Sequence, residues 1–240
     1  MKAREWIAVL DFGSQYTQLI ARRIRELGVF SELVRFDIGA GELKERCPAG
    51  IVLSGGPASV RDENTPRCDP GIFSSGVPVL GICYGMQLMG EALGGRVEQG
   101  RMREYGPARV RVLESDVLFR GLPREIEVWM SHGDRISEPP PGFKVLAATE
   151  GCPVAAMGDD RRGFFGLQFH PEVAHTPRGR EILHRFLYAV CGCRGDWSMP
   201  DFIREAVEEI RLRVGDERVL CALSGGVDSA VTAALVHRAV

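Results

Sequence analysis

Short apolar runs alternate with segments of helical period along the first half of the chain. Residues 6–13, WIAVLDFG, form an apolar run that ends in glycine, and residues 14–28 place apolar side chains on one face of a helix. Further strands are predicted at residues 29–36, 50–57 and 77–83. This alternation indicates βαβ units, and therefore a parallel sheet with helices on both faces.

The pattern changes between Arg96 and Phe169, where short apolar segments are joined by turns and few stretches have a helical period. Strands are predicted at residues 107–113, 126–132, 144–149 and 164–170. We expect antiparallel or mixed strands added to the parallel core, and a closing helix over residues 178–192. The predicted fold class is α/β, with a mixed, mainly parallel central sheet flanked by helices, similar to flavodoxin.

The end of the chain is predicted to be a separate part. Residues 1–193 form the first expected domain, and residues 194–199 form a linker. Residues 200–240 begin with a helical segment, and RVLCAL at 218–223 is then typical of a strand buried on both faces. A glycine turn and a second helix follow. Because the sequence ends eleven residues after Ser229, we expect this part to be a truncated α/β nucleotide-binding segment.

Composition and charge argue against a nucleic-acid-binding or a membrane protein. The chain has 240 residues, 45% of them hydrophobic and 26% charged, with a formal net charge of −2. A nearly neutral chain is not typical of a general nucleic-acid or membrane-surface binder. No apolar run approaches the ~20 residues that span a bilayer, and the first residues lack a signal-peptide core, so we expect a cytoplasmic protein.

The seven cysteines are expected to be free thiols, since the number is odd and the expected compartment is reducing. Cys191 and Cys193 form a C-x-C pair, but no second Cys/His pair with ligand spacing accompanies them. The sequence therefore predicts no metal site.

Cys83 stands where a predicted strand meets a predicted helix, in the sequence GICYG. Ligands of α/β sheets bind beyond the carboxyl ends of the strands, so this turn would direct the sulfur into the binding crevice. Gly81 and Gly85 would leave room where side chains clash. Free N–H groups at the helix start near Tyr84 would stabilise a thiolate or an oxyanion. A buried structural cysteine between two glycines is the alternative.

A thiol nucleophile needs a base, and the base needs a group that orients it. The segment LQFHPE supplies both, because His170 follows an apolar strand and Glu172 lies two residues further on. Gly55 and Gly56, in LSGGP, also follow a strand, and their backbone N–H groups could face a developing oxyanion. Taken alone, this glycine pair is more typical of an ordinary turn.

Together, LSGGP, GICYGMQ and FHPE resemble the class I, triad-type glutamine amidotransferases over roughly residues 6–190. The resemblance implies hydrolysis of the glutamine side-chain amide, with Cys83 as nucleophile, His170 as general base and acid, and Glu172 as orienting group. It further implies an oxyanion hole and a glutamine-binding set, formed by Gly56, Tyr84, Gln87, Ser131 and His132. For His132 a surface histidine is an equally good interpretation.

A second motif, SGGVDS at residues 224–229, follows the last predicted strand and opens the last helix. Successive backbone N–H groups and two hydroxyls would surround an anion there. The motif is not a Walker A loop, because no Lys-Ser/Thr follows the glycines. It resembles the pyrophosphate-gripping loop of the N-type ATP pyrophosphatases. The residues that would bind ATP are Ser224, Gly225, Gly226, Val227, Asp228 and Ser229.

The two motifs in this order resemble those of a family of two-part enzymes. The resemblance implies a carbon–nitrogen ligase in which ATP and Mg²⁺ activate xanthosine 5′-monophosphate and ammonia from glutamine aminates it. The glutaminase part would bind no cofactor of its own. A homodimer is expected only when further C-terminal sequence is present. Two alternatives remain open: the glutaminase of another triad amidotransferase, and a non-catalytic glutaminase-like binding module.

Overall fold

The computed structural model describes residues 5–240, apart from the side chains of residues 101–103. Within this part the strands form one sheet of nine, in the order β2-β1-β3-β4-β9-β8-β7-β5-β6. The strands are β1 (Trp6–Asp11), β2 (Phe30–Arg35), β3 (Gly50–Leu53), β4 (Val79–Ile82), β5 (Arg96–Val112), β6 (Glu125–Glu138), β7 (Lys144–Ala148), β8 (Ala156–Asp159) and β9 (Phe164–Leu167).

The sheet has a parallel half and an antiparallel half. Strands β2, β1, β3, β4 and β9 pair in parallel, whereas β9, β8, β7, β5 and β6 pair antiparallel. The order β2-β1-β3-β4 is that of a flavodoxin-like doubly wound sheet. The predicted mixed sheet, a parallel core with antiparallel strands added to it, is therefore confirmed.

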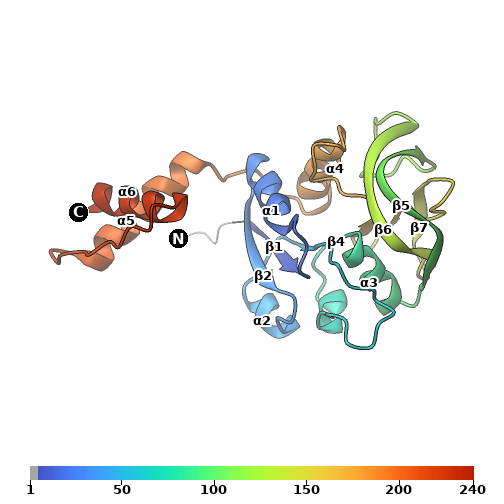
Figure 1. The fold of residues 1–240 in the computed structure, drawn as a ribbon, viewed down its shortest axis with the longest axis horizontal. Helices are drawn as coiled ribbons and strands as arrows, with labels where there is room; N and C mark the ends of the chain where they lie inside the picture. Colours follow the sequence, from blue (N-terminus) through green and yellow to red (C-terminus); the bar gives the residue numbers. More distant parts are fainter. Residues whose placement is uncertain (1–4) are drawn as a thin grey trace. The chain divides into compact units, whose positions relative to one another are not determined.

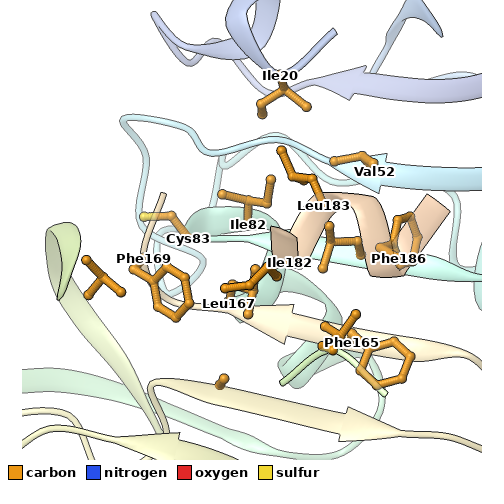
Figure 2. Close-up of a cluster of buried hydrophobic side chains, with 14 of the residues drawn as sticks. Ile20, Val52, Ile82, Cys83, Phe165, Leu167, Phe169, Ile182, Leu183 and Phe186 are labelled. Atoms are coloured by element: carbon orange, nitrogen blue, oxygen red, sulfur yellow. The ribbon is translucent and has the colours of Figure 1, made fainter. Parts of the chain in front are cut away.

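Helices cover both faces of the parallel half, and each face has its own apolar core. Helices α1 (Thr17–Glu26) and α4 (Gly179–Arg185), with the π-helical turn η2 (Phe186–Val190), pack on one face (Figure 2). Helices α2 (Ala40–Glu45) and α3 (Tyr84–Ala92), with the 3₁₀ turn η1 (Pro70–Ser74), pack on the other. Successive residues of β1 alternate between the two cores, which is why its sequence is continuously apolar.

Some elements were not predicted from the sequence. Strand β8 has four residues and α2 has six, and neither is long enough for a periodic pattern to be read. Strands β5 and β6 are also longer than predicted, because they pair as one ribbon that curves away from the parallel half (Figure 1). Within residues 5–240, no helix combines the length and the apolar character that a bilayer crossing requires.

The chain divides into two compact units, and the second comprises Trp197–Val240. The boundary lies within the segment 194–199 that the sequence marks as a linker. The second unit holds α5 (Met199–Val214) and α6 (Val227–Ala239), which pack against each other. Ser198 caps α5, since its hydroxyl accepts a hydrogen bond from the N–H of Asp201.

The strand predicted at residues 218–223 is not formed, so this prediction was wrong. These residues have no regular secondary structure, and Leu220 is 97% exposed. A strand is stable only when neighbouring strands satisfy its backbone groups. None of the nine strands of the described sheet comes from the second unit.

We expect the backbone amides of residues 218–223 to exchange with solvent much faster than those of β1, because the β1 amides lie in a ladder between β2 and β3. Hydrogen exchange followed by mass spectrometry measures this. Equal protection of the two segments would contradict the structure of the second unit.

Candidate active site

The turn at Cys83 bends the backbone into a strained conformation. Strand β4 ends at Ile82 and helix α3 begins at Tyr84, so Cys83 alone connects them. Its φ is +51° and its ψ is −107°, values that residues other than glycine rarely adopt. Such a conformation costs about 1–3 kcal/mol and persists only where the surrounding structure enforces it. The sharp turn predicted between the strand and the helix is therefore present at Cys83.

Gly81 and Gly85 make this turn possible by allowing backbone segments to approach closely. A Cβ on Gly85 would lie 2.3 Å from the carbonyl oxygen of Leu53, at the end of β3. A Cβ on Gly81 would lie 2.6 Å from the carbonyl oxygen of Gly85. Neither contact is tolerable, because each partner is backbone and cannot rotate away. The packing of β3, β4 and α3 therefore requires glycine at both positions.

His170 and Glu172 form a buried pair beside Cys83. The His170 Nδ1–H donates to Glu172 Oε1 at 2.7 Å, and both side chains are almost fully buried. Burial alone would lower the pKa of His170. The hydrogen bonds with Cys83 and with Glu172, and the charge of Glu172, outweigh burial and raise that pKa above its usual value. The arrangement therefore favours an imidazolium beside the sulfur, as a base that has taken the thiol proton requires.

Strand pairing brings His170 close to Cys83. Ile82 of β4 is paired with Leu167 of β9, and the N–H of Cys83 donates to the Leu167 carbonyl oxygen at 2.7 Å. The residues after β9 are held in turn by β6, since the N–H of His170 donates to the Trp129 carbonyl oxygen at 3.0 Å. The three predicted catalytic side chains, Cys83, His170 and Glu172, are thus brought together.

The glycine pair after β3 lies against His170 and Tyr84. A Cβ on Gly55 would lie 3.2 Å from His170 Cε1, and a Cβ on Gly56 would lie 3.4 Å from Cγ of Tyr84. Tyr84 is the first residue of α3, so its N–H has no acceptor within the helix. The backbone of Gly56 and the start of α3 are therefore neighbours beside Cys83, where two oxyanion donors are needed.

A cleft of about 350 Å³ opens in front of Cys83. The loop after β3, the start of α3, β5 and β6 supply its walls. Its lining residues are Gly56, Pro57, Ala58, Ser59, Cys83, Tyr84, Gln87, Gln99, Tyr105, Ser131, His132, Gly133 and Asp134. Its volume is in the range of small-molecule sites.

The predicted glutamine-binding residues Gln87, Ser131 and His132 all line this cleft. The amide nitrogen of Gln87 is already engaged, because it donates to the Asp134 carbonyl oxygen at 2.8 Å and to Gln168 Oε1 at 3.1 Å. The carbonyl oxygen of Ser131 accepts a hydrogen bond from the Cys83 thiol at 3.4 Å.

The ring of His132 is buried, and an acceptor lies within hydrogen-bond distance of each ring nitrogen. Nδ1 lies 3.0 Å from the Asp134 carbonyl oxygen, and Nε2 lies 3.1 Å from Glu104 Oε2. Burial lowers the pKa of His132, although the Glu104 carboxylate opposes this effect. Both ring nitrogens face groups of the protein, so the ring helps to position the 131–134 segment, whose residues line the cleft.

Two residues of the site were not singled out from the sequence, although both lie inside segments that were. Asp134 ends WMSHGD, and its carboxylate lines the cleft, where the Ser59 hydroxyl donates to it. Gln168 lies in LQFHPE, and its Nε2 is 3.7 Å from Cys83 Sγ. Gln168 directly follows β9, so its strand-end position was an available signal, whereas Asp134 lies inside β6, which extends beyond the strand end predicted at residue 132.

Among the described residues, Glu104, His132 and Cys152 bring three atoms able to bind a metal within 4.8 Å of one another. Glu104 also accepts a hydrogen bond from the Thr149 hydroxyl at 2.8 Å, and the Cys152 thiol donates to the Val154 carbonyl oxygen at 3.4 Å. Each of the three side chains therefore has hydrogen-bond partners within the protein, and these bonds explain why the three lie close together.

The residues of the second motif form an exposed turn that opens α6. The Ser224 and Ser229 hydroxyls are 3.1 Å apart, and Ser229 also donates to the Gly226 carbonyl oxygen at 2.9 Å. Gly225 has a φ of +83°, which favours glycine. Gly226 precedes the first helical residue, Val227, and Asp228 lies in the first turn. ATP binding by residues 224–229 stays a prediction.

Comparison with known proteins identifies the class. The sequence profile of the family "Glutamine amidotransferase class-I" matches residues 8–190, and the chain belongs to this family. A solved structure from Thermoplasma acidophilum, provisionally assigned as one subunit of GMP synthase, is 34% identical with a TM-score of 0.70, over 80% of this chain and 96% of that one. A glutamine amidotransferase from Thermotoga maritima, 19% identical with a TM-score of 0.61, covers 80% of this chain and 100% of its own, and supports the fold.

Two curated relatives carry the same name. The GMP synthase [glutamine-hydrolyzing] of Geobacillus kaustophilus is 58% identical over 99% of this chain, and that of Aquifex aeolicus is 53% identical over 99%. The chain spans about half the length of these relatives, since it covers 46% of each.

We expect Gly85→Ala to lower the free energy of unfolding by about 3 kcal/mol, because the added Cβ meets the Leu53 carbonyl oxygen. Gly41→Ala is the matched control. Gly41 lies in α2 with open space around it, so alanine should stabilise the helix by up to about 1 kcal/mol. Urea denaturation measures both changes, and a neutral Gly85→Ala would contradict the close approach of α3 and β3.

We expect a chloroketone analogue of glutamine to label Cys83 selectively. Burial raises the pKa of four other thiols, those of Cys68, Cys152, Cys191 and Cys193. A thiol with a raised pKa holds little thiolate near neutral pH. Iodoacetamide serves as the control reagent, because it should also label the exposed Cys47. Peptide mapping locates the label, and preferential labelling of Cys191 or Cys193 would defeat this assignment.

Proposed function

We propose that this chain is the glutamine-hydrolysing part of a GMP synthase. It would release ammonia from glutamine for the ATP-dependent amination of xanthosine 5′-monophosphate to GMP. The observation that carries the proposal is the strained Cys83 facing a cleft, with the hydrogen-bonded pair His170–Glu172 beside it. The names of the relatives, and the SGGVDS turn that follows, favour GMP synthase over the glutaminase of another triad amidotransferase.

The proposed reaction begins when His170 takes the thiol proton of Cys83. The sulfur attacks the side-chain carbonyl carbon of glutamine, and the N–H groups of Gly56 and Tyr84 stabilise the oxyanion. His170 then returns the proton to the leaving nitrogen, which departs as ammonia, and a thioester remains on Cys83. Water, deprotonated by His170, attacks the thioester and releases glutamate. Glutamine and water thus give glutamate and ammonia.

The cleft walls are suited to an amino-acid substrate. Asp134 is the acidic residue among those lining the cleft, and its carboxylate, which also contacts Arg61 at 3.6 Å and Ser59, would attract the α-ammonium group of glutamine. The backbone of residues 131–134 would hold the rest of the substrate backbone.

The second motif would act in the other half of the reaction. Residues 224–229 would grip the pyrophosphate of ATP, with Mg²⁺, while the adenylyl group activates the nucleotide. A homodimer would require sequence beyond this chain. These partners follow from the GMP synthase relatives and are part of the proposal.

Cys83→Ala, placed in a protein of the relatives' full length, should abolish GMP formation from glutamine and leave formation from added ammonium largely intact. The physical reason is that the substitution removes the nucleophile and with it only the ammonia supply. Cys47→Ala is the control, because this exposed thiol lies outside the cleft. Loss of both activities with an unchanged circular dichroism spectrum would refute the two-site proposal.

A further inference from the structure

Two buried side-chain amides connect the wall of the cleft to the sulfur of Cys83. Gln87 lies on α3 and Gln168 follows β9, and they are 4% and 0% exposed. Gln87 Nε2 donates to the Asp134 carbonyl oxygen at 2.8 Å and to Gln168 Oε1 at 3.1 Å. Gln168 Nε2 in turn donates to Cys83 Sγ at 3.7 Å, a distance that suits the large sulfur atom.

The donor–acceptor direction of this series of hydrogen bonds is set by Asp134, at the end opposite Cys83. A backbone carbonyl oxygen can only accept, so the NH₂ group of Gln87 must face Asp134. Both hydrogens of that group are then used, one on Asp134 and one on Gln168. Gln168 therefore presents its oxygen to Gln87 and its NH₂ group to the sulfur. The backbone of β6 thus determines that an N–H donor, not a carbonyl oxygen, faces the nucleophile.

An N–H donor affects the two charge states of sulfur differently. A thiolate is a much stronger acceptor than a thiol, so the Gln168 amide stabilises the charged sulfur more than the neutral one. The carbonyl oxygen of Ser131 has the opposite preference, because it accepts the S–H hydrogen bond of the neutral thiol. The sulfur therefore contacts two groups with opposite effects: the Gln168 amide favours the thiolate, and the Ser131 carbonyl oxygen favours the neutral thiol.

We propose that Gln168 is a further catalytic residue, which donates a hydrogen bond to Cys83 Sγ and stabilises the thiolate. The thiolate occurs twice in the reaction: when His170 removes the proton, and when the carbon–sulfur bond of the thioester breaks and its electron pair returns to sulfur. This role rests on the proposed glutaminase function. It differs from that of Gln87, which holds Gln168 in orientation and lines the cleft.

The test compares Cys83 alkylation in two variants of this chain. Gln168→Met keeps the length of the side chain but removes the donor. Gln168→Glu keeps an acceptor for Gln87, and at pH 8 its carboxylate offers the sulfur no donor. Gln18→Met and Gln18→Glu are matched controls, because Gln18 is exposed on α1. Iodoacetamide is the probe, since it is uncharged and needs no glutamine-binding cleft, and peptide mapping separates Cys83 from the exposed Cys47.

Both Gln168 variants should label Cys83 about 10- to 100-fold more slowly than the unchanged chain, the range expected for a hydrogen bond to a charged group. Labelling of Cys47, and of Cys83 in the Gln18 variants, should be unchanged. Circular dichroism and the thermal midpoint establish that each variant is folded. The methionine variant is the decisive one, because a carboxylate buried beside Cys83 would also slow labelling by repelling the thiolate.

Two results would overturn the proposal. One is a folded Gln168 variant that labels Cys83 within twofold of the unchanged rate. The other is a variant with a raised KM for glutamine but unchanged labelling, because Gln168 would then serve the cleft through Gln87. Labelling does not depend on glutamine hydrolysis. A chain that hydrolyses no glutamine, yet labels slowly in the Gln168 variants, would therefore reject the proposed function and keep the role of Gln168 at the sulfur.

Discussion

The close approach of β3, β4 and α3 at Gly81 and Gly85 is the constraint on which the site depends. Without side chains at these positions, the helix can begin directly after the strand, and Cys83 is held at a φ of +51°. The energetic cost of this strain is small compared with the stabilisation that the two buried cores around the turn provide. Packing energy distributed over the sheet therefore maintains one unfavourable backbone conformation, and that conformation turns the sulfur toward the cleft.

Parallel pairing extends this constraint to the base. Because Ile82 is paired with Leu167, the residues that follow each strand leave the sheet side by side. The first residue after β4 is Cys83, the proposed nucleophile, and the first after β9 is Gln168, with His170 two residues further. Burial of His170 would remove its charge, but Glu172 and the sulfur restore it. The register of two four-residue strands thus sets both the distance and the electrostatics of the candidate catalytic pair.

The sequence allowed prediction of features that depend on local pattern. Short apolar runs and their flanking residues predicted the parallel strands and the turn at Cys83. They also predicted that Gly56, Cys83 and His170 each follow the end of a strand. The neighbours of β4 could not be predicted, because β9 reaches it only after four intervening strands. The missing strand at 218–223 has a related cause, since its apolar composition suits a buried strand but strand formation depends on pairing that composition does not reveal. The orientation of the His132 ring was equally hidden, because Glu104 lies 28 residues away in sequence.

The two halves of the sheet contribute differently to the site, and this difference explains where sequence reasoning was strongest. The parallel half supplies the reacting groups, from the ends of β3, β4 and β9, where glycine turns and strand-end histidines leave a clear local signal. The antiparallel half supplies the opposite wall of the cleft, from β5 and β6. There Ser131 acts through its carbonyl oxygen, and the carbonyl oxygen of Asp134 orients Gln87 and, through it, Gln168. Backbone groups carry no sequence signature, so the chemistry of this site could be predicted from its residues more fully than the means by which it holds a substrate.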